Sequence, residues 1–111
     1  MAYDERLADR VRERLGAVNG VTERAMFGGL AFLVRGNMAV GITGGGELMV
    51  RLGPDAGDAA LDEPHTRPFD MTGRPMRGWI VVAAAGIATD AQLGAWVERG
   101  VEFARTLPPK G

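Results

Sequence analysis

The sequence predicts an α+β fold in two layers, with one antiparallel five-stranded sheet and helices on one of its faces. Amphipathic helical patterns stand at both ends of the chain, and short strand-like runs joined by glycine-rich turns fill the middle. The 111 residues are 46% hydrophobic and 24% charged, which is typical of a globular chain. We expect one domain over residues 1–111, with the element order α-β-β-β-α-β-β-α.

The first helix is expected over residues 4–15. Asp4 is a suitable N-cap, and Gly16 is a suitable terminator. Apolar side chains recur at every fourth position and line one face of this helix: Tyr3, Leu7, Val11 and Leu15. Because the other positions are almost all charged, we expect the helix to lie with this face against the rest of the fold.

A meander of three strands is expected next, after an approach over residues 21–29. The loops that join the strands are Gly36-Asn37, a two-residue hairpin signal, and the three glycines at residues 44–46. The strands span residues 30–35, 38–43 and 47–52.

These loops set the register of the meander. The first loop pairs Leu33 with Val40, and the second pairs Ile42 with Leu48. One face then forms the core: Ala31, Leu33, Met38, Val40, Ile42, Leu48, Val50 and Leu52. The opposite face is only half apolar and includes Leu30, Phe32, Val34 and Met49. A half-apolar face of this kind is either covered by another element or offered to a partner, so it is a candidate binding surface.

The second half of the chain predicts two helices around two strands. Pro68 favours an edge position for the strand that contains it, and Thr89 with Gln92 three residues later forms a capping box for the last helix. That helix has one apolar stripe: Leu93, Trp96, Val97, Gly100, Val101 and Ala104. The other elements are a short helix over 54–61, strands over 66–71 and 78–85, and a turn over 72–75.

Composition argues against several classes of function. The chain has no cysteine and no serine, and His65 is its single histidine, so neither a thiol nor a serine nucleophile is available. We therefore expect no catalytic residues, no metal and no cofactor. The charged N-terminus lacks the apolar core of a signal peptide, and no run is long enough to span a membrane. A cytoplasmic location without membrane contact is expected.

Two segments stand out because they place arginine, methionine and an aromatic residue beside glycine or proline. The first is residues 24–29, and the second is residues 73–79. Tightly specified backbone in a folded corner is one interpretation of both segments, and a corner that binds a partner is the other. The candidate interaction residues are Met26, Phe27, Gly28, Gly29, Phe32, Arg74, Pro75, Met76, Arg77 and Trp79.

The same segments carry a family resemblance. Three short runs resemble the N-terminal domain family of TfoX (Sxy), a bacterial competence regulator: residues 26–29 (MFGG), 36–38 (GNM) and 73–76 (GRPM). The resemblance covers almost the whole chain. It implies a fold similar to the secretion-chaperone-like arrangement of an antiparallel sheet and helices in two layers. It also implies a regulatory role rather than an enzymatic one.

Three hypotheses for function follow. The first is a non-enzymatic regulatory or protein-interaction module with an unidentified protein partner, which includes a homodimer. The second is a nucleic-acid-associated transcriptional accessory protein that uses Arg24, Arg74 and Arg77, although the net charge of -1 gives no general attraction for nucleic acid. The third is a small-molecule-binding domain, for which the sequence offers few convergent polar groups.

Overall fold

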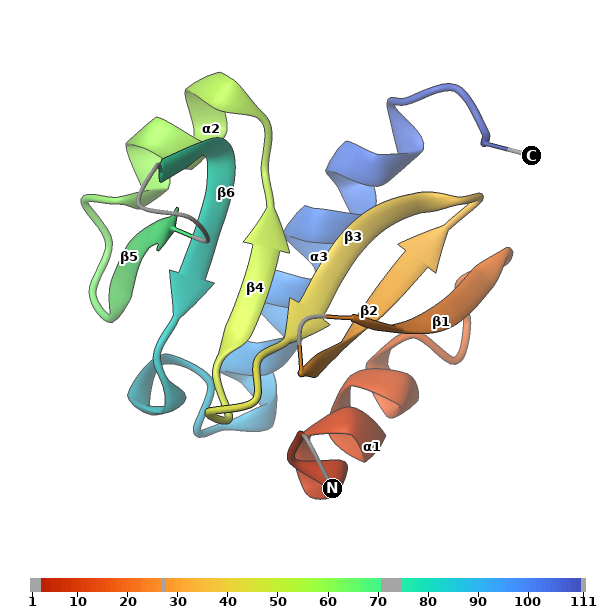
Figure 1. Ribbon diagram of the computed structural model, residues 1–111, viewed down its shortest axis with the longest axis horizontal. Helices are drawn as coiled ribbons and strands as arrows, with labels where there is room; N and C mark the ends of the chain where they lie inside the picture. The colour runs from red at the N-terminus through yellow and green to blue at the C-terminus, as the bar shows by residue number, and fades with distance from the viewer. Residues whose placement is uncertain (1–2, 27, 71–74, 111) are drawn as a thin grey trace.

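The computed structural model describes residues 3–26, 28–70 and 75–110 (Figure 1). In these residues, six strands form one antiparallel sheet in the order β1-β2-β3-β4-β6-β5, and three α-helices accompany it. This confirms the α+β class and the single antiparallel sheet, with six strands instead of five. The elements are α1 (Glu5–Arg14), β1 (Val21–Met26), β2 (Gly29–Val34), β3 (Asn37–Ile42), β4 (Leu48–Arg51), α2 (Pro54–Ala60), β5 (Thr66–Asp70), β6 (Pro75–Val82), a 3-10 turn (Ala84–Gly86) and α3 (Asp90–Arg105).

The additional strand is β1, which the sequence pattern had presented only as an approach to a strand. It pairs along its whole length with β2, from Val21 opposite Val34 to Met26 opposite Gly29. Its four central side chains, residues 22–25, are all exposed. A strand that is exposed on both faces has no alternation of apolar and polar residues, so the usual signal for a strand is missing.

The hairpin between β2 and β3 differs from the predicted one by one residue. Its turn is Arg35-Gly36, with φ values of 52° and 82°, the backbone of a two-residue type I′ turn. Val34 therefore lies opposite Asn37. Two residues further along β2, Phe32 lies opposite Val40, which is three residues further along β3, so β3 contains a one-residue bulge. The prediction that Leu33 pairs with Val40 is wrong.

The bulge exchanges the two faces of β2 relative to the prediction, because it moves the pairing by one residue. Leu30, Phe32 and Val34 belong to the hydrophobic core, and Phe32 has no exposed surface at all. The expectation that Phe32 lies on a free face is therefore wrong, because a shift of one residue turns every side chain of a strand over. The register between β3 and β4 is as predicted: Ile42 lies opposite Leu48.

Helices α1 and α3 contribute the other layer of the core. The predicted stripe of α1 is buried at Leu7, Val11 and Leu15, and every predicted stripe residue of α3 is buried. Both N-caps are confirmed. Asp4 accepts hydrogen bonds from two backbone N–H groups of α1, and Thr89 forms the capping box with Gln92.

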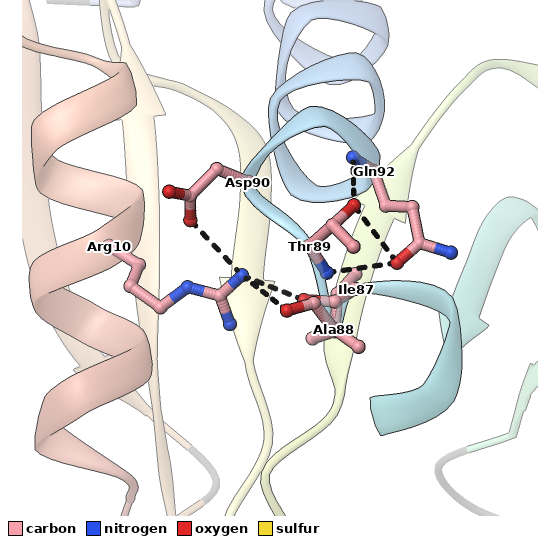
Figure 2. A network of polar contacts seen from close by, with 6 residues as sticks. All are labelled: Arg10, Ile87, Ala88, Thr89, Asp90 and Gln92. Carbon is pink, nitrogen blue, oxygen red and sulfur yellow. Dashed lines mark hydrogen bonds and ion pairs between the residues drawn. The ribbon is translucent and has the colours of Figure 1, made fainter.

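The start of α3 is tied to α1 by one arginine (Figure 2). Arg10 reaches from α1 and donates to the carbonyl oxygen of Ile87 at 2.8 Å, and it also lies 3.5 Å from the carboxylate of Asp90. The capping box sits directly beside this contact. The capping box and the Arg10 contacts therefore hold the same turn, and Arg10 links it to α1.

The second half of the sheet ends in β5, which confirms the edge position that Pro68 predicts. The neighbouring strand β6 begins at Pro75, three residues before the predicted start. Of the candidate residues, Phe27 and Arg74 lie outside the described residues, and so does most of the turn expected over 72–75. No helix in the described ranges has the length and apolar character that crossing a membrane requires.

Candidate interaction surface

The two motif segments lie at opposite ends of the sheet. Met26 ends β1 and faces Gly29, at the level of the turn between β3 and β4. Pro75 begins β6 at the other end, beyond the level where Trp79 lies opposite Arg51. Three strands separate β1 from β6 (Figure 1). The structure therefore does not join the two segments into one corner.

The arginines of the nucleic-acid hypothesis are separated in the same way. Arg24 lies on β1 at one edge of the sheet, and Arg77 lies on β6 near the other. The guanidinium of Arg77 is also paired with the carboxylate of Asp58, at 3.2 Å. These two side chains form no common basic patch.

The glycines of the first segment have a structural explanation. Gly28 has a φ of 75°, a left-handed conformation that favours glycine. Gly29 is buried against β3, where a Cβ atom would overlap the carbonyl oxygen of Ile42. Met26 is half-buried. Among the described residues of this segment, Gly28 and Gly29 are therefore set by the packing of the backbone.

One glycine of the second segment is structural as well. Gly78 has a φ of 92°, and its carbonyl oxygen accepts hydrogen bonds from the N–H groups of Leu52 and Gly53, at 2.8 and 3.2 Å. Helix α2 lies directly on this strand, because a Cβ atom on Gly57 would come within 2.8 Å of the Cα atom of Gly78. Backbone contact between α2 and β6 therefore requires glycine at both positions.

The neighbours of Gly78 have side chains that reach the surface. Met76 is 38% exposed and Leu61, at the end of α2, is 37% exposed. Within the described part of the chain, these are the two large hydrophobic side chains that are exposed. Both line one shallow depression of about 120 Å³, together with Gly57, Asp58, Pro68, Arg77, Gly78 and Trp79. We call Leu61, Pro68, Met76, Arg77 and Trp79 the Met76 surface.

Trp79 is held in place from several sides. Its ring centroid lies 6.1 Å from that of Phe69, and the guanidinium carbon of Arg51 lies 5.4 Å from the Trp79 centroid. The same guanidinium lies 5.5 Å from the ring of Phe103 on α3. Each of these is within the range of favourable aromatic or cation–π contact. The half-buried Trp79 is therefore a fixed wall of the depression.

Sequence reasoning found part of this surface and missed the rest. Met76, Arg77 and Trp79 were candidates, whereas Leu61 and Pro68 were not, and neither was Arg51, which contacts Trp79. Arg51 meets Trp79 only because β4 pairs with β6, and Leu61 joins Met76 only because α2 lies on β6. The one local signal for Leu61 is an isolated leucine directly before Asp62 and Glu63 at the end of a predicted helix.

Among the described residues, the pKa shifts belong to two ion pairs at other places on the surface. The hydrogen bonds from Arg12 lower the pKa of Glu23, and those from Arg67 lower the pKa of Glu47. The Arg12 pair has N–O distances of 2.8 and 2.9 Å. The first pair fastens α1 to β1 and the second fastens β5 to the start of β4, so both shifts have a structural cause.

Potential metal ligands do not cluster in the described ranges, which hold no group of three or more His, Cys, Asp or Glu residues that could bind an ion.

Comparison with known proteins gives one family. The model of the family described as the TfoX N-terminal domain matches residues 13–104, which includes both motif segments and the Met76 surface. No curated protein and no solved structure gives a significant match.

Proposed function

The chain belongs to the TfoX N-terminal domain family, and from this premise we propose that it is a non-catalytic protein-interaction module of regulatory type that binds its partner through the Met76 surface. Membership supports a TfoX-like regulatory domain. The location of the contact on the Met76 surface, the protein nature of the partner and the cytoplasmic setting are our proposal.

The observation that carries this proposal is the exposure of Leu61 and Met76 in one place. They come from different elements, α2 and β6, and they line the same depression beside Trp79 and Arg77. Tryptophan and arginine are enriched among residues that dominate binding energy, and methionine adapts its shape to a partner. The surface thus combines a fixed aromatic wall with two exposed apolar side chains, one of which is the adaptable Met76.

The size of the depression favours a protein partner over a small molecule. Sites for small molecules usually measure about 300–1,000 Å³, whereas this depression measures about 120 Å³. It suits a single apolar side chain presented by a larger surface. The exposed ion pair of Arg77 with Asp58 borders it and can exchange partners at little cost, because exposed pairs contribute only about 0–1 kcal/mol.

The edges of the sheet are poor sites for the addition of a partner strand. β5 is short, contains Pro68 and has an irregular register between Pro68 and Asp70. β1 carries the charged residues Glu23 and Arg24 at its centre. Proline, irregularities and charges are the features that block pairing at an edge. Side-chain contact at the Met76 surface is therefore the mode of binding that we propose.

The test is affinity capture with two matched methionine variants. Tagged wild-type chain, Met76→Asp and Met26→Asp are used to capture partners from native lysate after nuclease treatment, and the proteins are identified by mass spectrometry. We expect Met76→Asp to lose a specific partner that wild type and Met26→Asp retain. Loss in Met26→Asp alone would move the contact to the first segment, and the absence of any protein captured specifically by wild type would refute the proposal.

A further inference from the structure

We propose that the tip of the β2–β3 hairpin is a docking site for an extended, proline-containing peptide segment, and that residues 108–110 of this same chain occupy it. The site consists of Arg35, Gly36 and Asn37, two of which belong to the GNM segment that the Met76 surface does not explain. The chain leaves α3 on the side of this hairpin (Figure 1). Residues 108–110 lie outside the range that the family model matches.

Asn37 makes the first contact. The residue is 3% exposed and, in the part of the chain that the structure describes, is the one buried polar residue. The Nδ2 group of Asn37 donates a hydrogen bond to the carbonyl oxygen of Pro108 at 2.8 Å. A buried amide that loses its partner is costly. Burial of the Asn37 side chain is therefore favourable only while the carbonyl oxygen of Pro108 accepts this hydrogen bond.

The turn makes the second and third contacts. The N–H group of Lys110 donates to the carbonyl oxygen of Arg35 at 2.8 Å. Gly36 lies so close to Lys110 that a Cβ atom at position 36 would overlap the carbonyl oxygen of Lys110. Arg35 itself has a φ of 52°, which is unfavourable for a residue other than glycine and persists only where its surroundings hold it.

These contacts define the class of ligand. The hairpin accepts a hydrogen bond from the backbone N–H of residue 110 and donates one to the backbone carbonyl of residue 108. It therefore recognises the backbone of an extended segment. The middle residue contributes no hydrogen bond, and in this chain it is Pro109, which has no N–H group. Prolines at 108 and 109 restrict the free segment towards extended conformations, which reduces the entropy lost on docking. The last residue of the segment must retain its N–H group.

The test is hydrogen exchange of the Lys110 amide, followed by NMR on the full chain. We expect this amide to be protected in wild type, and we expect Asn37→Asp, which keeps the side-chain shape but removes the donor, to reduce the protection about tenfold. Amides of β3 and α3 serve as the control for an intact fold. An unprotected Lys110 amide in wild type, or unchanged protection in a folded Asn37→Asp variant, would overturn the proposal.

A second variant changes the docked segment instead of the hairpin, in case Asn37→Asp does not fold. Lys110→Pro removes the N–H donor of the segment without touching the hairpin. We expect the side-chain amide protons of Asn37, slow to exchange in wild type, to exchange faster in Lys110→Pro. Unchanged exchange would overturn the proposal. Protection of Lys110 that rises with protein concentration would also overturn it, because a second copy would then supply the segment.

Discussion

Two of the hairpins that carry family motifs, β1–β2 and β5–β6, use their glycines in the same way but differ in whether the neighbouring side chains are buried. In the β1–β2 hairpin, Gly29 lies against β3 and the side chains that follow it enter the core. In the β5–β6 hairpin, Gly78 lies against α2, yet Met76 before it remains exposed. Glycine in these motifs therefore marks close approach of the backbone. The exposed neighbours of Gly78, such as Met76, are the residues that we propose as the contact with a partner.

The largest expected effect compares a core residue of the first hairpin with a surface residue of the second. Phe32→Ala should lower the free energy of unfolding by about 3–5 kcal/mol, because it leaves a cavity in the core. Met76→Ala should change it by no more than about 0.5 kcal/mol, because surface substitutions rarely do more. Urea denaturation measures both. Similar losses of unfolding free energy in the two variants would contradict the assignment of Phe32 to the core and Met76 to the surface.

The next effect separates conformation from packing within the first hairpin. Gly29→Ala should destabilise by about 2–3 kcal/mol, because the new methyl group overlaps the rigid backbone of β3. Its neighbour provides the control. Gly28→Ala should cost only about 1–2 kcal/mol, the cost of a left-handed conformation, because open space surrounds that position. A larger loss in Gly28→Ala than in Gly29→Ala would contradict the packing explanation.

The smallest effect concerns the ion pair of each hairpin. Hydrogen bonds from arginine lower the pKa values of Glu23 and Glu47 below their ordinary value of 4.5. Each carboxylate therefore stabilises the fold above that pH, and the contribution is lost as the pH falls through the lowered value. Because the side chains are partly exposed, each pair should contribute less than about 1 kcal/mol.

Thermal unfolding at about pH 6 and about pH 3 measures this contribution. Wild type should lose more stability on acidification than Glu23→Gln or Glu47→Gln, since the variants have already lost the pair at both pH values. Equal losses in all three chains would show that these carboxylates do not link stability to pH.

Local patterns predicted much of the fold. The cap at Asp4, the capping box at Thr89 and the three-glycine turn need only nearby residues, and all three are confirmed. The β2–β3 turn was misplaced because Gly36-Asn37 is the usual hairpin pair, whereas here Asn37 lies in the strand and bonds to Pro108. That contact spans 71 residues of sequence, so no local pattern reveals it.

The candidate surface was predictable only in part for the same reason. Met76 and Trp79 stand in a conspicuous segment, but the partners that shape their surface come from α2 and β4. Phe32 was assigned to the surface because one bulge in β3 could not be seen in the sequence. Pairings between distant elements therefore decided which of the candidate residues remained exposed.

The most direct test of the Met76 surface is photo-crosslinking from one position on that surface and one position on the β1–β2 hairpin. A photoreactive amino acid is placed at Leu61, on the proposed surface, and in a second chain at Thr22, an exposed position on β1. The proposed contact requires that position 61 crosslinks to a protein partner in cells and that position 22 does not. Crosslinks from position 22 with none from position 61 would contradict it.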